Sequence, residues 1–249
     1  GMRPDDGSIR TLRPDCPEPV RRAVMKQGWW DLAYLHWRYD PDEVARLLPD
    51  GLEVDTFDGG AWVGLVPFSM RGIGVPRLPA VPWLGAFPEI NVRTYVIRNG
   101  VPGVWFFSLD VNRLLPALVA RAAYRLPYCW GSASNEMSGQ SLVSSVSRRW
   151  PDRGPSTRTV VVPGEEISEQ SPLEVFLTAR WGLYSRGYGR SLMYAPVDHP
   201  RWVLHRARAV TVDDSLVVAA GLPTPTGEPH CMFSPGVPVR VGLPRRVTW

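Results

Sequence analysis

Runs in which apolar and polar residues alternate dominate the chain, and they predict a fold built mainly from β-strands. The runs cover residues 34–39, 52–57, 61–70, 89–97, 104–111, 141–150, 158–162, 192–197, 203–212 and 215–222. Asp58-Gly59 and Asn99-Gly100 each separate two such runs, which is the strongest short-range signal for a β-hairpin. The chain is therefore predicted to be mostly antiparallel β.

Three segments with helical spacing interrupt the strands. Residues 40–49 begin with Asp40 as N-cap and a proline at the first helical position, and residues 171–181 repeat this arrangement with Ser171. The segment 112–127 is more apolar and ends at a proline. A sheet of about ten strands must curl or close, because open edges and wide flat sheets are costly. We expect a mainly β (α+β) fold, a closed or strongly curled antiparallel β-barrel with a few packing helices.

One boundary stands out along the chain. Residues 1–20 contain four prolines and mixed charge, so we expect a flexible N-terminal arm there. Residues 151–158 are the next breaker-rich stretch, and they are short enough to be a loop. We therefore expect a single barrel domain over residues 21–249.

Composition indicates a globular protein, with 44% hydrophobic residues and eleven tryptophans. The formal charge is +4, and Lys26 is the only lysine among the basic residues. The arginines are scattered and mixed with acids, whereas nucleic-acid binding favours basic residues gathered on one face. We therefore expect no nucleic-acid partner.

Cys16, Cys129 and Cys231 are widely separated, which argues against a disulfide framework or a thiolate zinc site. No apolar segment follows Met2, and no run of about eighteen apolar residues occurs anywhere. These features predict a cytoplasmic protein without export signal or membrane span.

Motifs for metal or cofactor binding are absent from the sequence. There is no H-E-x-x-H, no P-loop and no G-x-S-x-G, and the four histidines show no ligand spacing. We expect no metal and no cofactor.

Residues 87–95, FPEINVRTY, place unlike polar groups on one side of a predicted strand. Glu89, Asn91 and Arg93 share that side, and Glu89 and Arg93 lie about 13 Å apart at the rise of a β-strand, too far to neutralise each other. Either this side is a solvated outer face, or it is the concave side of a curled sheet and forms a small-molecule site. The aromatic, proline-rich residues 76–88 before it and the apolar run 104–111 after it favour a central strand.

The segments HWRYDPDEVARLLPDGLEVDTFDGGAWVGLVPFSM, FPEINVRTYV, GVWFFSLD, ARAAYRLPY, LEVFLTARWGLY and HPRW occur in this order. In them the chain resembles the bacterial YqjF-like family, a domain of unknown function, from about residue 29 to residue 246. That family looks like a branch of the acetoacetate decarboxylase-like superfamily. The resemblance implies a double-sided, cone-like β-barrel with a central pocket, and superfamily likeness favours a homo-oligomer.

The decarboxylases carry a pocket glutamate in an aromatic-Pro/Asn-Glu motif, and residues 87–89 are similar, so the resemblance implies that Glu89 is its counterpart. Their later motif is Gly-Arg-Glu, four positions ending in proline, and a lysine pair. Here the same register gives Arg121 for the arginine, alanine for the acid, and Tyr128 and Cys129 for the lysines. The decarboxylases need an amine that forms an imine. We therefore expect no Schiff base and no acetoacetate decarboxylation.

Several candidate roles remain open at this point. Arg121 lines the pocket, or it is an ordinary helix-face arginine that is solvated or caps a carbonyl. His36 is a general acid or base or lies on a sheet surface. Tyr128 donates a hydrogen bond to a carboxylate or carbonyl, or it packs under the barrel rim. Cys129 is a nucleophile, if an arginine lowers its pKa, or an inert buried thiol.

We expect a small-molecule-binding barrel for a small carboxylate or keto acid. Arg93 and Arg121 would hold the anion, Asn91, Tyr128 and His36 would contribute polar contacts, and Glu89 is the catalytic candidate. An alternative is a lyase-like acid–base enzyme without covalent lysine chemistry, acting in the same pocket, so whether the protein is an enzyme stays open. A second alternative is an assembly domain with a filled barrel.

Overall fold

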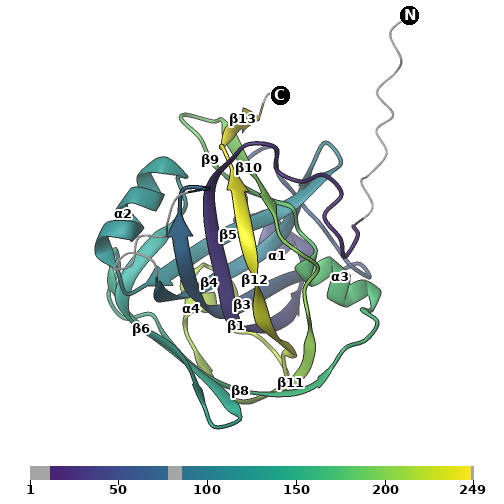
Figure 1. The fold of residues 1–249 in the computed structure, drawn as a ribbon, viewed down its shortest axis with the longest axis vertical. Helices are drawn as coiled ribbons and strands as arrows, with labels where there is room; N and C mark the ends of the chain where they lie inside the picture. The colour runs from purple at the N-terminus through teal and green to yellow at the C-terminus, as the bar shows by residue number, and fades with distance from the viewer. Residues whose placement is uncertain (1–11, 78–85, 248–249) are drawn as a thin grey trace, which may run out of the picture.

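The structure is a computed structural model, and it describes residues 12–77 and 86–247 of the 249-residue chain. Within these ranges the chain forms thirteen strands and four short helices (Figure 1). In chain order they are β1 (Ala23–Tyr39), α1 (Pro41–Ala45), β2 (Glu53–Val54), β3 (Ala61–Gly74), β4 (Ala86–Arg98), β5 (Val101–Val111), α2 (Leu114–Ala123), β6 (Tyr128–Ser138), β7 (Ser141–Trp150), β8 (Ser156–Glu166), α3 (Pro172–Thr178), β9 (Gly182–Arg186), β10 (Leu192–Asp198), β11 (His205–Asp214), α4 (Leu216–Ala219), β12 (His230–Gly242) and β13 (Arg245–Val247).

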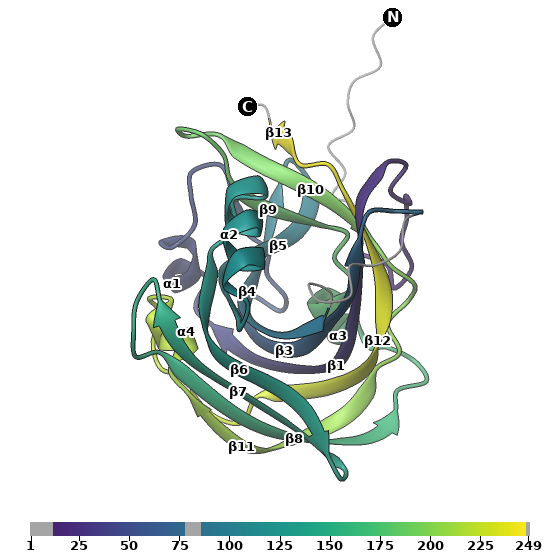
Figure 2. The same cartoon turned by 60° about the vertical axis from the view of Figure 1, so that its left-hand side comes forward.

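The strands close into two rings that share a wall. The first, here called the cavity ring, runs β10-β9-β5-β4-β3-β1-β12 and closes where β12 pairs with β10. The second, the packed ring, runs β5-β6-β7-β8-β11-β12-β1-β3-β4 and closes where β4 pairs with β5. Figure 2 looks into the cavity ring, with β6, β7, β8 and β11 as a layer on the far side of the shared wall. Closure pairs strand edges that would otherwise be open, and it confirms the predicted barrel.

Side chains of the shared wall alternate between the two interiors, as the pleat of a β-strand requires. On β3, Leu65 packs in the core of the packed ring, whereas Phe68 faces the cavity ring. On β4, Ile90 and Val92 belong to the packed core, whereas Glu89 lines the cavity. The strand that carries the polar row is therefore central, and its polar side is the concave side.

β1 keeps one face toward the cavity ring along its length because its alternation shifts at Asp31. Asp31 has a φ of 49°, and the pairing of β1 with β3 changes register between Trp30 and Leu35. An irregularity of this kind moves the inward-facing positions by one residue. Gln27 before it and Tyr34 after it therefore line the same cavity.

Local signals in the sequence formed as predicted at three places. Asn99 and Gly100 join β4 to β5 with φ values of 47° and 73°, and a positive φ at both central positions is typical of a type I′ hairpin turn. Asp40 and Ser171 are the N-caps of α1 and α3, and each side chain accepts a backbone N–H of the first turn.

The prediction of a strand over residues 215–222 is wrong, because the structure forms α4 there. Leu216 and Val217 are fully buried in the packed core, and the Asp214 carboxylate accepts the Val217 N–H at 3.0 Å. A short apolar run fits a buried strand and a buried helical turn equally well, and here the preceding acid stabilises the turn. The predictions also missed β6, β9, β12 and β13.

The predicted arm, residues 1–20, is described only from residue 12 onward. Residues 12–20 form neither helix nor strand. Leu12 nevertheless packs against the core, and the buried Val20 donates its N–H to the Asp198 carboxylate at 2.5 Å. Of the proline-rich segment 76–88, residues 78–85 lie outside the described residues.

Candidate functional site

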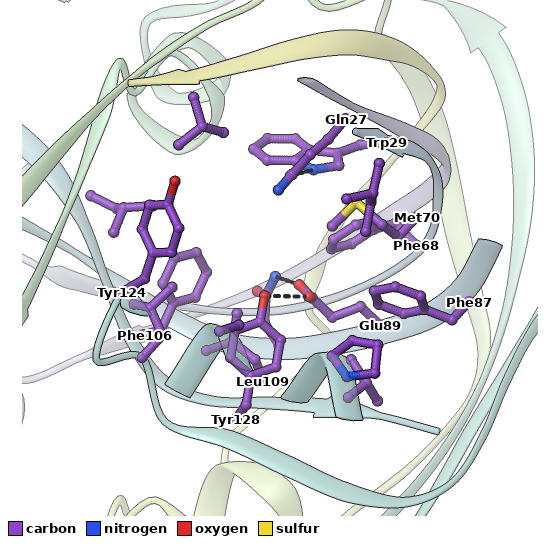
Figure 3. Close-up of a pocket in the computed structure, with 18 of the residues that line it drawn as sticks. Gln27, Trp29, Phe68, Met70, Phe87, Glu89, Phe106, Leu109, Tyr124 and Tyr128 are labelled. Carbon is purple, nitrogen blue, oxygen red and sulfur yellow. Dashed lines mark hydrogen bonds between the residues drawn. The ribbon is translucent and has the colours of Figure 1, made fainter. Parts of the chain in front are cut away.

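The cavity ring encloses a cavity of about 350 Å³ with a mostly apolar lining. Aromatic side chains form much of the wall, among them Trp29, Phe68, Phe87 and Phe106 (Figure 3). α2 covers one side of the ring and contributes its inner face to the lining (Figure 2). A concave, largely apolar space with a few convergent polar groups is the usual form of a small-molecule site.

Glu89, Asn91 and Arg93 all line this cavity from β4, and Tyr128 joins them from the start of β6. The Tyr128 hydroxyl donates a hydrogen bond to Glu89 Oε1 at 3.0 Å, and Asn91 Nδ2 donates to Glu89 Oε2 at 3.5 Å. Figure 3 shows the Glu89 and Tyr128 side chains meeting inside the cavity. Both oxygens of one buried carboxylate thus have neutral donors.

Burial raises the pKa of Glu89 from its ordinary 4.5 to about 7. The hydrogen bonds from Tyr128 and Asn91 act in the opposite direction but do not offset the loss of solvation, and the more distant Asp110 carboxylate raises the pKa further. Burial, reinforced by the Glu89 charge, raises the pKa of Tyr128 well above its ordinary value. A carboxyl group with a pKa near neutrality can give or take a proton, whereas Tyr128 stays a neutral donor.

Arg93 brings a buried guanidinium to the same face of β4. Its Nε donates to the Tyr95 hydroxyl and its Nη2 to the Leu177 carbonyl, both at 3.1 Å. Its Cζ lies 5.5 Å from the centroid of the Tyr34 ring. Among residues 12–77 and 86–247, Arg93 forms no ion pair. A buried cation without a carboxylate is expensive, and an anionic ligand lowers that cost.

Two polar atoms of the cavity residues are buried without a hydrogen-bond partner among the described residues. They are Asn91 Oδ1 and the Tyr34 hydroxyl. Buried polar groups in folded proteins are normally paired, so each such atom calls for an explanation.

His36 shares the inward face of β1 with Tyr34, on whose ring it stacks, but it is not part of the cavity lining. Its Nε2 is 2.5 Å from the Tyr95 hydroxyl, and its ring packs over Gly64 of β3 so closely that a Cβ at Gly64 would lie 2.7 Å from Nε2. Burial first, and then the Arg93 charge, hold the pKa of His36 well below its usual range. His36 therefore reaches the site through Tyr95, which also binds Arg93.

Arg121 also lies outside the lining of the cavity. Its Nη1 donates to the Tyr128 carbonyl at 2.8 Å, and its guanidinium lies over the Trp150 ring at 4.7 Å. Cys129 is buried beside it, and burial raises the pKa of this thiol to about 12. Such a thiol is not a nucleophile at neutral pH.

Lys26 is also absent from the lining. It lies on β1 between Met25 and Gln27, which both line the cavity, so the alternation of the strand directs it to the opposite face.

Sequence reasoning missed several lining residues, notably Gln27, Trp29, Tyr124 and Trp202. Their segments carry aromatic and polar residues, but no pattern in the sequence indicates that α2 and β1 face one another across a space.

Among the described residues, no group of three or more His, Cys, Asp and Glu side chains is placed to hold a metal ion. No helix in the described part of the chain has the length and hydropathy needed to cross a membrane.

The double ring and its cavity define an acetoacetate decarboxylase-like barrel. The chain superposes on the enduracididine biosynthesis enzyme MppR, solved in complex with pyruvate, with a TM-score of 0.64 at 15% identity over 92% of each chain. It superposes on an acetoacetate decarboxylase-like enzyme from Sphingomonas wittichii RW1 with a TM-score of 0.64 at 13% identity, over 97% of this chain and 98% of that one. At these identities the likeness shows the fold alone.

The chain belongs to the DUF2071 family, whose model, described as an uncharacterized conserved protein, matches residues 26–238. It is 34% identical to the uncharacterized protein YqjF of Bacillus subtilis (strain 168) over 208 residues, which cover 83% of this chain and 85% of that protein. These matches confirm the resemblance noted in the sequence.

Proposed function

We propose that this protein binds a small organic acid, a carboxylate or keto acid, in the cavity ring and does so without forming an imine. The observation that carries the proposal is a row of polar groups on the floor of an apolar cavity. Arg93 supplies a buried cation without an ion pair among the described residues, and Glu89, Asn91 and Tyr128 supply a separate hydrogen-bonding cluster.

The spacing along β4 supports two-point binding of the ligand. Glu89 and Arg93 are four residues apart, about 13 Å along a strand, so a ligand that contacts both must be an extended acid, whereas a shorter one meets the guanidinium or the Glu89 cluster together with Asn91. Asn91 lies between them, and its unpartnered Oδ1 suits a hydroxyl or enol donor on the ligand. MppR, which shares the fold at 15% identity, was solved with pyruvate, and this is consistent with an acid of that class.

The acid–base enzyme is the second candidate, and Glu89 is the observation that favours it. A carboxyl group with a pKa of about 7 can remove a proton from the carbon next to a ligand carbonyl. The electron pair of that C–H bond forms a C=C bond, the π pair of the carbonyl moves to its oxygen, and N–H or O–H donors such as Arg93 and Tyr128 stabilise the resulting enolate oxyanion. Lys26 takes no part, since it does not line the cavity.

A screen of small keto and hydroxy acids by calorimetry and thermal shift tests the binding proposal. Arg93→Gln keeps polar N–H donors near Tyr95 but removes the charge, so we expect carboxylate affinity to fall by about tenfold to a hundredfold. The affinity for the matched neutral amide of each acid should change little in this variant. If Arg93→Gln binds both the acid and its amide as tightly as the wild type does, the assigned role of Arg93 is contradicted.

Glu89→Gln separates the two candidates. If the protein is an enzyme, this substitution abolishes turnover of a bound acid, whereas ligand binding persists. Exchange of the ligand's C–H protons with deuterated solvent, followed by NMR, provides the readout. A wild-type protein that binds the acid but exchanges no proton is a binding protein only. If no acid binds, the filled-barrel alternative is favoured.

A further inference from the structure

The middle of β5 is the place where the two rings separate. Val104 and Trp105 pair with β9 of the cavity ring, whereas residues 109–111 pair with β6 of the packed ring. Between these pairings a groove of about 430 Å³ opens beside the C-terminal end of α2. We call it the fork groove.

Three arginines line the fork groove from different elements. Arg121 and Arg125 come from the last turn of α2 and the residues after it, and Arg186 comes from the end of β9. None of the three forms an ion pair within the part of the chain that the structure describes. Three arginines around one hollow concentrate positive charge there, and that charge attracts an anion.

Contacts with aromatic rings and carbonyls hold these guanidinium groups in place. Arg125 lies over the Tyr188 ring at 4.2 Å, and Arg186 lies over the Trp105 ring at 5.6 Å. The Nε of Arg125 donates to the Arg186 carbonyl at 3.0 Å, which ties two of the arginines together. Stacking uses the flat face of a guanidinium and leaves most of its five N–H groups at the edge to bind another acceptor.

The backbone at this position is itself unusual. Arg125 has a φ of 52°, in the left-handed region that non-glycine residues rarely occupy. Strained backbone of this kind concentrates at functional sites, where the surrounding structure holds it. Here it turns the chain sharply after α2, and it lies in the same residue that carries the stacked guanidinium.

We propose that the fork groove is a second ligand site, and that it binds a phosphate-bearing anion between Arg121, Arg125 and Arg186. A phosphate group matches the site better than a single carboxylate does, because it carries up to two charges and offers several oxygens to the guanidinium edges. The site differs from the cavity, whose arginine is Arg93. Phe106 and Leu126 line both hollows, so the two sites lie back to back.

Titration calorimetry with inorganic pyrophosphate tests this proposal on the intact protein. We expect saturable binding with one site per chain, weakening at high salt. Arg125→Ala and Arg186→Ala should each reduce the affinity about tenfold, since each removes a charged hydrogen-bond donor. Both side chains are exposed, so circular dichroism and thermal melting should show that the fold persists.

Arg208→Ala is the matched control, because Arg208 is an exposed arginine on β11, away from the groove. The Arg208→Ala variant should bind pyrophosphate with the affinity of the wild type. The Glu89→Gln variant, altered in the cavity and not in the fork groove, should also bind pyrophosphate with that affinity. Equal losses in Arg186→Ala and Arg208→Ala, or binding that does not saturate, would overturn the proposal, because binding would then reflect net charge only.

Adenosine diphosphate distinguishes two kinds of phosphate ligand, a phosphate ester that carries an organic group and a free phosphate. Tighter binding of the nucleotide than of pyrophosphate assigns the groove to a phosphate ester with an organic group, whereas equal binding assigns it to free phosphates. Failure of both probes to bind would overturn the proposal and leave the cavity's proposed function unaffected.

Discussion

The hydroxyl of Tyr128 donates a hydrogen bond to Glu89 Oε1, at 3.0 Å, although 39 positions separate the two residues in the chain. They lie on β6 and β4, which both pair with β5. The resemblance to the decarboxylases predicts a tyrosine, Tyr128, at the position of their lysine, and in the structure a neutral phenol contacts this buried acid. Because no cation pairs with Glu89 among the residues that the structure describes, burial has the largest effect on its pKa.

The first prediction concerns stability as a function of pH. Glu89 has a pKa of about 7 in the fold against an ordinary 4.5, so between these values the folded protein holds a proton that the unfolded chain has released. The free energy of unfolding therefore falls as pH rises through this window, by about 3 kcal/mol in total for this group. Glu89→Gln has no carboxyl group to titrate at this position. The free energy of unfolding of this variant, minus that of the wild type, should therefore increase by that amount between pH 4 and pH 8, as measured by denaturant unfolding. Parallel stability curves would contradict the assigned pKa.

The second prediction tests the hydrogen bond itself. Tyr128→Phe removes the donor that stabilises ionised Glu89, so the pKa of Glu89 should rise above 7. The difference in free energy of unfolding between Tyr128→Phe and the double variant Tyr128→Phe/Glu89→Gln should change with pH. The midpoint of that change should lie at higher pH than the midpoint for the pair of wild type and Glu89→Gln. An unchanged midpoint would mean that the hydroxyl does not contact the carboxylate in solution.

Much of the fold was predictable because its signals are local. The Asn99-Gly100 turn and the Asp40 and Ser171 caps depend on the residues of one turn, and each formed as predicted. β12 (His230–Gly242) was missed because Pro235, Gly236 and Pro238 interrupt its alternation. Such residues are tolerated there because the strand bends as it passes between the two rings, which is a property of the closed sheet.

The site residues on β4 could be predicted from the sequence, but the other residues that line the cavity could not. Alternation places Glu89, Asn91 and Arg93 on one side of a strand from sequence alone, whereas the direction of that side depends on which way the sheet closes. The position of Arg121 illustrates the limit. The resemblance predicted Arg121 as a ligand-binding residue, yet the structure places its guanidinium over the Trp150 ring and against the Tyr128 carbonyl, outside the cavity lining.

The third prediction concerns the size of the ligand. The cavity wall beyond the polar row is aromatic and aliphatic, so each methylene that a 2-keto acid adds to its side chain should bury apolar surface. A buried methylene contributes about 0.8 kcal/mol, which corresponds to about fourfold in affinity per added carbon. Calorimetry across a series from pyruvate to longer straight-chain keto acids should show this rise until the cavity is filled. A flat or falling series would mean that the apolar wall does not contact the ligand.

The last prediction tests the absence of imine chemistry and the register of Tyr128 together. Borohydride treatment in the presence of acetoacetate should leave Lys26 unmodified, as read by peptide mass spectrometry, because that side chain does not line the cavity. Tyr128→Lys introduces an amine beside Glu89 in a buried site, where desolvation lowers the pKa of a lysine and leaves a larger fraction of it as the nucleophilic free base. This variant should form a borohydride-trapped adduct at position 128, whereas Lys26→Arg should behave as the wild type does. An adduct at Lys26 in the wild type would contradict the placement of that lysine, and a folded Tyr128→Lys that binds acetoacetate without forming an adduct would contradict the register.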